Sequence, residues 1–188
     1  MKIDGNAIRP GMVIHHKDRL LVATRIQHTQ PGKGGAYLQV ELKDIRDGTK
    51  LNERFRSSES VERVRLWDTS HQFLFADADF FTFMNSETFE QTIINRDMLG
   101  SSAAFLQDGM EVMIQSHEDE VVGVSLPETV VLAIAETEAV VKGQTAASSY
   151  KPAILENGLR IMVPPHIETG VRVVVNTADA TYRERAKD

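Results

Sequence analysis

Lys33 is the side chain best placed to do chemistry in this sequence, because it stands alone in a turn built from glycine and proline. The turn reads Gln30-Pro31-Gly32-Lys33-Gly34-Gly35-Ala36. Proline fixes φ and glycine allows positive φ, so this backbone can reverse tightly and pass close to a partner. No neighbouring side chain shields the primary amine. We expect Lys33 to act as a binding probe that carries one positive charge into a narrow space.

Two other interpretations compete with a binding probe. Lys33 can be a solvated residue of an ordinary glycine-rich turn, and local sequence alone favours that role. A phosphate-binding loop would need Gly-x-x-x-x-Gly-Lys followed by Ser or Thr and then a helix. Lys33 is followed instead by Gly34 and a strand pattern, so we reject the phosphate loop.

Strand-like runs flank the turn on both sides. Residues 20–27 are rich in β-branched and apolar side chains, and apolar Leu38, Val40 and Leu42 alternate with polar residues. We therefore expect a hairpin. Arms of roughly eight residues, rising about 3.3 Å per residue, would carry the Lys33 ammonium on the order of 25 Å from the hairpin base.

The sequence lacks the groupings of the common catalytic and metal sites. It contains no cysteine, which excludes disulfides, thiolate nucleophiles and Cys-ligated zinc. The histidines show no zinc spacing, and neighbours such as His15 and His16 would point to opposite faces of a strand. The serine pair Ser57-Ser58 sits in no nucleophile elbow. We predict a binding protein with no catalytic residue, metal or cofactor, rather than an enzyme.

Composition describes a globular chain with an uneven charge distribution. Of 188 residues, 41% are hydrophobic and 26% are charged, and the formal net charge is -6. Residues 1–64 carry a net +4, residues 65–127 a net -9 and residues 128–188 a net -1. Affinity for phosphate backbones comes mainly from Lys and Arg. Only the first segment is therefore expected to attract polyanions.

Neither a leader nor a membrane segment is evident in the sequence. The first residues lack the apolar region of a signal peptide, and runs such as Val130 to Ala135 are far too short to span a bilayer. The absence of cysteine agrees with a reducing compartment. We expect a cytoplasmic protein that has no membrane partner.

Most of the chain consists of short strand patterns separated by turn residues. Boundaries near Val64 and Pro127 divide it into three domains, which at about 60 residues each would bury modest cores and depend on packing between domains. One helix is expected around residues 96–107, where Gly100 can break it into two turns. Further strands are expected at residues 12–14, 50–56, 72–76, 80–84, 111–115, 121–126, 128–135, 159–163 and 171–175.

Four phenylalanines of the second domain recur at a period of two. We expect one face of each strand to carry them into the core: Phe73, Phe75, Phe81 and Phe83. A base-stacking platform would show a similar pattern, but the basic flanking residues that such a platform needs are missing. The acidic pair Asp77 and Asp79 is explained by a turn between the two strands.

Several short motifs occur in an order that resembles the bacterial elongation factor P family. They are Pro31-Gly32-Lys33-Gly34-Gly35-Ala36, the run from Phe83 to Gln91, Lys142-Gly143-Gln144-Thr145, Lys151-Pro152-Ala153 and Val163-Pro164. Each motif is weak alone. Their order and spacing cover essentially the whole chain and agree with three small β domains.

The resemblance implies an all-β fold of three small barrels. Residues 1–64 would form a KOW or SH3-like domain, and residues 65–127 and 128–188 two OB-like domains, in an L-shaped arrangement that resembles tRNA. Members of the family that the chain resembles bind the 70S ribosome between the peptidyl and exit sites. They contact peptidyl tRNA, initiator or prolyl, and stimulate peptide bond formation at consecutive prolines. The resemblance also implies a monomer.

The resemblance assigns roles to particular residues of this chain. Lys33 looks like the family's tip residue, a target of lysine-modifying enzymes that attach β-lysine, and it would contact the CCA end of the tRNA. Because the tip is lysine here, the arginine rhamnosylation of other branches is excluded. The surrounding tip loop is Pro31, Gly32, Gly34 and Gly35.

Two features near the end of the chain carry weaker implications. Tyr182 and Arg185 resemble a Tyr-x-x-Arg pattern that would contact tRNA or the small subunit, and a frayed terminus is the alternative. Residues Ala146 to Tyr150 replace a glycine-rich stretch that in some relatives approaches the exit-site codon. A contact of this loop with messenger RNA is left open.

Three competing functions can be separated by experiment. An elongation-factor-P-like paralogue would carry a different tip loop, against which the Pro-Gly-Lys-Gly tip argues. An OB-type RNA-binding chaperone would bind free RNA with a steep salt dependence, and the net -9 of the second segment disfavours it. An enzyme would need turnover on a small substrate that no motif suggests.

Overall fold

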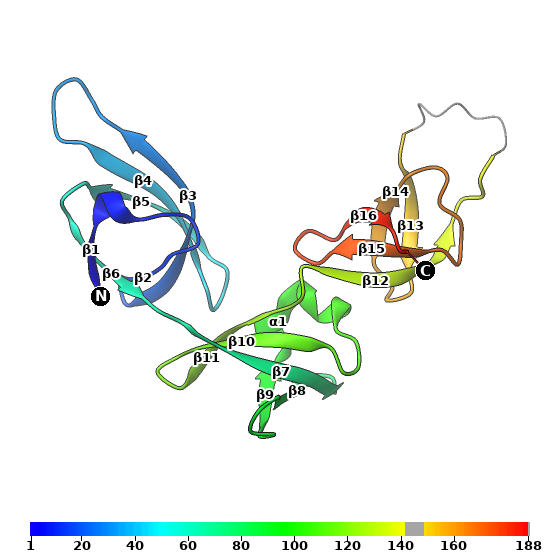
Figure 1. The fold of residues 1–188 in the computed structure, drawn as a ribbon. Coiled ribbons are helices and arrows are strands. Elements are labelled where there is room, and N and C mark those ends of the chain that lie inside the picture. The colour runs from blue at the N-terminus through cyan, green and yellow to red at the C-terminus, as the bar shows by residue number, and fades with distance from the viewer. Residues whose placement is uncertain (142–148, 188) are drawn as a thin grey trace. The chain divides into compact units, whose positions relative to one another are not determined.

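The computed structural model describes residues 1–141 and 149–187, and it confirms the expected all-β fold (Figure 1). The strands form three sheets of six, five and five strands. The chain divides into two compact units, residues 1–69 with 113–124, and residues 70–112 with 125–188. Among the described residues, no helix has the length and apolar character needed to cross a membrane.

The N-terminal sheet contains the hairpin expected around Lys33. Its strand order is β1-β6-β2-β3-β4-β5, and a 3₁₀ helix, η1 (Gly5–Ala7), follows β1. The strands are β1 Lys2–Asp4, β2 Val13–His16, β3 Arg19–Thr29, β4 Tyr37–Asp44, β5 Lys50–Arg56 and β6 Ser60–Val64. Alternation along β4 turns Leu38, Val40 and Leu42 into the core, where all three are fully buried. The predicted hairpin is therefore confirmed as β3 and β4.

The central sheet has the strand order β11-β10-β7-β8-β9. Its strands are β7 Trp67–Ala76, β8 Phe80–Asn85, β9 Gln91–Asn95, β10 Glu111–His117 and β11 Glu120–Ser125. The predicted turn between β7 and β8 is confirmed. Asp77 Oδ1 accepts hydrogen bonds from the backbone N–H of Asp79 at 2.9 Å and of Phe80 at 2.8 Å, which is how a short acidic side chain closes a turn.

Three of the four phenylalanines predicted for the central core lie there, and one does not. Phe73, Phe81 and Phe83 are 6%, 4% and 0% exposed, and Phe73 packs against the other two rings. Phe75 is 58% exposed, so its predicted core position is wrong. A β-bulge shifts the register between Phe73, which pairs with Phe83, and Phe75, which pairs with Thr82. The extra residue turns Phe75 to the outer face.

The helix expected over residues 96–107 forms as two short pieces, as Gly100 predicted. α1 (Arg96–Leu99) begins after Asn95, whose side chain accepts a hydrogen bond from Asp97 N–H at 2.9 Å. Gly100 follows with a φ of 54°, which ends the α-helix. The chain continues as a 3₁₀ helix, η2 (Gly100–Phe105).

The C-terminal sheet has the strand order β14-β13-β12-β15-β16. Its strands are β12 Thr129–Thr137, β13 Lys151–Leu155, β14 Arg160–Val163, β15 Arg172–Asn176 and β16 Thr181–Arg185. Phe105 of η2 is 3% exposed and belongs to the core of this sheet. Asn157 Nδ2 also donates to the Ala104 carbonyl oxygen at 2.9 Å. Unit 2 is thus held together by η2, which packs against the C-terminal sheet.

Candidate functional site

Lys33 lies in the loop that joins β3 to β4 (Figure 1). Every residue from Gln30 to Ala36 is exposed. Gly34 has a φ of 124°, which side-chain-bearing residues rarely adopt, and a Cβ on Gly32 would meet no atom within 4 Å. Within the described residues, the Lys33 ammonium takes part in no hydrogen bond or ion pair. The amine is therefore free to be modified or to contact a partner.

The loop is anchored where it returns to the sheet. Tyr37, the first residue of β4, pairs with Arg56 of β5. Ser57 donates to the Ala36 carbonyl oxygen twice, from its backbone N–H at 3.1 Å and from its hydroxyl at 2.9 Å. The guanidinium carbon of Arg54 lies 3.5 Å from the centroid of the Tyr37 ring, a cation–π contact. These contacts hold the base of the loop and leave its tip open.

Arginines gather on the outer face of the sheet that carries the loop. Cross-strand partners share a face, and the register of β3, β4 and β5 puts Arg25, Arg54 and Arg56 on one face. All three are exposed, and Glu41 is the one carboxylate in their described cross-strand rows. An excess of guanidinium groups over carboxylates favours a polyanion such as a nucleic-acid backbone.

Sequence reasoning missed the arginines of β5, although a signal for them exists. Arg54 and Arg56 flank Phe55, which is buried, so the period of two in Arg-Phe-Arg indicates two exposed cations on one strand face. The effect of Arg54 reaches Tyr37, the first residue of β4. Hydrogen bonding from Arg54, and then from Thr29, holds the pKa of the Tyr37 phenol below its ordinary value.

Tyr182 and Arg185 lie on β16, the edge strand of the C-terminal sheet, and not in a frayed terminus. Tyr182 pairs with Val175 and Arg185 pairs with Val173, with a register shift between the two pairs. Residues three apart on a regular strand point to opposite faces. The bulge in β16 therefore brings Tyr182 and Arg185 to the same face, because both partners, Val173 and Val175, are buried side chains of β15.

Tyr150 is a further aromatic side chain beside this pair. Its ring centroid lies 6.4 Å from that of Tyr182, in an edge-to-face arrangement, and Tyr150 is itself 54% exposed. Burial raises the pKa of the Tyr182 phenol above its ordinary value, and electrostatic repulsion from Tyr150 and from Glu184 adds to this effect. Of the loop Ala146 to Tyr150 weighed for a messenger-RNA contact, residues 146–148 lie outside the described residues.

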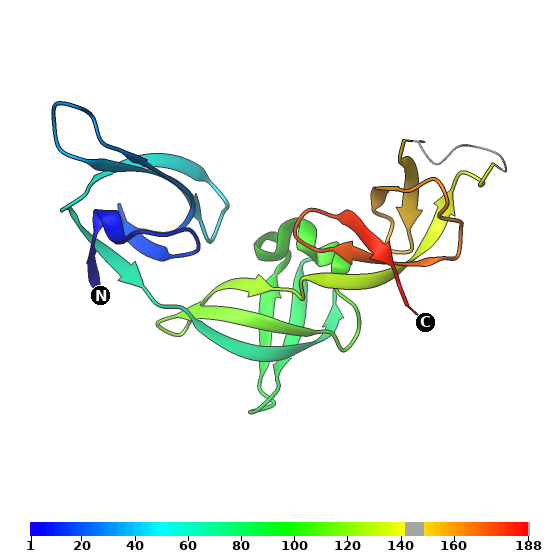
Figure 2. The same ribbon diagram turned by 45° about the horizontal axis from the view of Figure 1, so that its top comes forward.

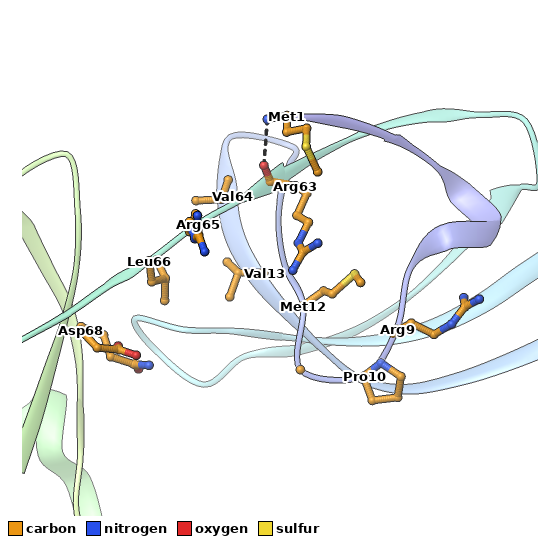
Figure 3. Close-up of a pocket in the computed structure, with 12 residues that line it drawn as sticks. Met1, Arg9, Pro10, Met12, Val13, Arg63, Val64, Arg65, Leu66 and Asp68 are labelled. Carbon is orange, nitrogen blue, oxygen red and sulfur yellow. Dashed lines mark hydrogen bonds between the residues drawn. The ribbon is translucent and has the colours of Figure 1, made fainter.

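A cavity of about 870 Å³ opens in the first unit (Figure 3). Arg63 and Arg65 line it together with apolar Met12, Val13 and Leu66. Within the described residues, neither guanidinium donates a hydrogen bond or joins an ion pair. Such a lining suits an anionic group better than a cation. The described part of the chain holds no cluster of three or more His, Cys, Asp or Glu side chains that could bind a metal ion.

Two solved structures share this fold. Eukaryotic translation initiation factor 5A from Methanococcus jannaschii has a similar structure, with a TM-score of 0.55 over 68% of this chain and 92% of that chain. The translation initiation factor eif-5a family protein from Naegleria fowleri gives a TM-score of 0.51 over 67% and 98%. At 21% and 16% sequence identity, these likenesses show the fold alone.

Sequence comparison gives the particular family. Three family models match in succession: the elongation factor P KOW-like domain over residues 4–61, its OB domain over 66–124 and the elongation factor P C-terminal model over 130–185. Elongation factor P of Parvibaculum lavamentivorans is 59% identical over 186 residues, which cover 99% of this chain and 100% of that protein. That of Rhodospirillum centenum is 54% identical over 188 residues and the full length of both. The chain belongs to the elongation factor P family.

Membership in this family brings its function. The chain is a translation elongation factor that relieves ribosomes stalled at polyproline sequences, and it binds the ribosome and tRNA. It is a cytoplasmic factor and not an enzyme. The predicted family, fold class and function are confirmed by these comparisons.

Proposed function

We propose that Lys33 is the functional residue of this elongation factor, and that its amine, extended by β-lysylation, contacts the CCA end of the peptidyl tRNA. The observation that carries this proposal is the free, exposed amine at the tip of a hairpin whose strands have 11 and 8 residues. Pro31, Gly32, Gly34 and Gly35 would shape the tip. Lysine-modifying enzymes would reach Lys33 without unfolding the sheet.

The proposed role of Lys33 is positioning and not bond chemistry. The ring of proline restricts its backbone and makes it a poor reactant in peptide bond formation. Holding the CCA end in a productive geometry lowers the entropic part of the barrier. A tip that is anchored at its base by Ser57 and Tyr37 would hold the amine in place better than a free loop.

Other parts of the chain would contribute to the placement of the factor between the peptidyl and exit sites. Arg25, Arg54 and Arg56 would face phosphates of the acceptor arm of an initiator or prolyl tRNA. Tyr182 and Arg185, which share one face of β16, would contact tRNA or the small subunit. Their common face supports a joint contact, since one partner surface can touch both side chains.

The chain would act as a monomer of three domains, residues 1–64, 65–127 and 128–188. Three sheets and three successive family matches support this division. The first domain would present the tip to the tRNA, in agreement with its net charge of +4. The net -9 of the second would disfavour contact with RNA phosphates.

A reconstituted translation assay on a template with consecutive prolines tests the role of Lys33. It compares no factor, the factor purified from its own host, the Lys33→Ala variant and the Lys50→Ala variant as a matched control. Lys50 is also exposed, at the start of β5. We expect Lys33→Ala to lose most of the rescue with unchanged thermal unfolding, and Lys50→Ala to keep it. Full rescue by a folded Lys33→Ala protein would refute the proposal.

Intact-mass spectrometry of the native factor tests the modification separately. A mass increase equal to one lysyl residue on the tip peptide would support β-lysylation of Lys33. An unmodified tip in a factor that rescues fully would reject the modification and keep the positioning role. Absence of rescue by the folded, natively modified factor would favour the paralogue or an RNA-binding chaperone.

A further inference from the structure

The outer face of β7, β8 and β9 carries apolar side chains where a surface sheet normally carries polar ones. These strands are neighbours in the central sheet and lie side by side in both ribbon views (Figure 2). Phe75 of β7 pairs with Thr82 of β8, and Thr82 pairs with Ile93 of β9, so the three form one cross-strand row. Phe75 is 58% and Ile93 is 68% exposed, whereas Thr82 between them is only 6% exposed.

Further side chains of β8 extend this row into a patch. Phe80 and Met84 lie two residues before and after Thr82, so they point to the same outer face. Phe80 is 44% exposed and Met84 is half-buried. We call the set the outer-face patch: Phe75, Phe80, Thr82, Met84 and Ile93. The bulge in β7 completes it, because without the register shift Phe75 would be in the core.

Acidic residues predominate around the patch. From Leu66 to Asn95 the sequence has no lysine or arginine and five acidic residues. The next cation, Arg96, is already engaged: its side chain donates to the carbonyl oxygens of Ala78 at 2.8 Å and Asp77 at 3.0 Å. A nucleic-acid backbone would thus meet more carboxylates than cations around this patch.

We infer that the outer-face patch is a docking surface for a basic protein, whose apolar side chains cover Phe75 and Ile93 while its Lys and Arg face the acidic surroundings. Contiguous exposed apolar side chains with a polar surround mark protein contact sites. The ribosome that this factor binds contains both RNA and basic protein, and the acidic surroundings of the patch favour the protein. This contact is separate from the arginine face of β3, β4 and β5.

Charge substitution at Ile93 distinguishes the two kinds of partner. Ile93→Lys and Ile93→Glu both remove the same exposed apolar side chain, but they add opposite charges. We expect Ile93→Lys to weaken binding to 70S ribosomes with peptidyl tRNA about tenfold and Ile93→Glu about threefold or less, because like charges at an interface repel. Met162→Lys is the matched control, since Met162 of β14 is an exposed apolar residue elsewhere, 48% accessible.

The inference would be overturned if Ile93→Glu bound the ribosome more weakly than Ile93→Lys, or if both variants bound it as tightly as the parent protein. An RNA partner would bind Ile93→Lys as tightly as the parent or more tightly. Thermal unfolding of each variant checks that the fold is intact, which the exposure of Ile93 leads us to expect. Phe75→Ser serves as a second variant that removes apolar area without adding charge, and it should also weaken binding.

Photocross-linking identifies the class of partner directly. A benzoylphenylalanine is placed at position 93, and at position 101 of η2 as an exposed control, and each protein is irradiated on 70S ribosomes. Cross-links from position 93 to a basic ribosomal protein, with none from position 101, would support the inference. Cross-links to RNA alone, to a second copy of this chain, or to nothing would overturn it.

Discussion

Two lysines of this chain show how surroundings decide what one residue type can do. Lys33 is exposed at the tip of a loop and has no partner among the described residues. Lys151 of β13 is 8% exposed, and its Nζ donates to the Glu138 carbonyl oxygen at 2.6 Å. A lysine that stabilises the fold in this way is committed to its hydrogen bond. Only the lysine without a structural role is free for modification and for a partner.

Asp77 gives a prediction for the acid range. Hydrogen bonds from the backbone N–H groups of Asp79 and then Phe80 hold the pKa of Asp77 below its ordinary value of 3.8. The Asp77 carboxylate therefore stabilises the fold fully above pH 3.8, and this stabilisation is lost as the pH falls through the lowered folded-state pKa. In the Asp77→Asn variant, the melting temperature should fall less steeply with decreasing pH than in the parent protein over this acid range. Thermal unfolding over a pH series measures it.

Asp108→Asn is the control for that experiment. Asp108 is exposed and its carboxylate accepts no hydrogen bond within the described residues. The control should follow the parent curve at every pH. Melting curves of Asp77→Asn that run parallel to the parent throughout would contradict the assigned role of the turn.

At the scale of single elements, local packing limits what the N-terminal sheet can accept. η1 packs closely against β5. A Cβ added to Gly5 would lie 2.3 Å from the Arg56 carbonyl oxygen and 3.1 Å from Phe55 Cβ. Gly5 N–H also donates to the Glu59 carbonyl oxygen at 2.7 Å. The short helix can approach the strand this closely only because position 5 has no side chain.

Gly5→Ala should therefore lower the free energy of unfolding by about 1 to 3 kcal/mol, since the backbone must shift to admit the methyl group. Gly35→Ala is the matched control, because a Cβ at Gly35 would meet no atom within 4 Å. The control should stay within about 0.5 kcal/mol of the parent. Denaturant unfolding of both variants measures the difference. Equal free energies of unfolding for Gly5→Ala and the parent protein would show that η1 moves away from β5 without loss of stability.

At the scale of the whole molecule, one side chain joins segments that are far apart in sequence. Phe105 of η2 lies in the core of the C-terminal sheet among residues such as Leu132 and Val173. Gln107 Nε2 adds a hydrogen bond to the Val131 carbonyl oxygen at 3.2 Å. Unit 2 therefore has a core that neither η2 nor the C-terminal sheet could complete alone.

Phe105→Ala should reduce the stability of unit 2 by about 3 to 5 kcal/mol, because it leaves a cavity the size of an aromatic ring. Hydrogen exchange should show that β12 and β15 lose protection together. Phe89→Ala is the control, because Phe89 is 67% exposed and should contribute little. Loss of protection confined to η2 would argue against a shared core.

The sequence predicted the hairpin, the turn at Asp77 and the helix break at Gly100, because each depends on local chemistry and short-range periodicity. It failed at Phe75 and missed five short strands, where the result depends on how one strand pairs with another: β1, β6, β9, β13 and β16. The alternation rule holds only along an uninterrupted strand. A bulge is set by the register of two strands together, and one strand's sequence does not reveal it.

By itself, then, the sequence determined the all-β class, the exposed tip lysine and the family, since these follow from residue types in order along the chain. Only the tertiary structure decided which side chains share a face: the arginines of β3 and β5, Tyr182 with Arg185, and Phe75 with Ile93. It also decided that Phe105 completes the C-terminal core. The physical reason is that strand register and core packing are non-local, because they depend on residues that folding alone brings together.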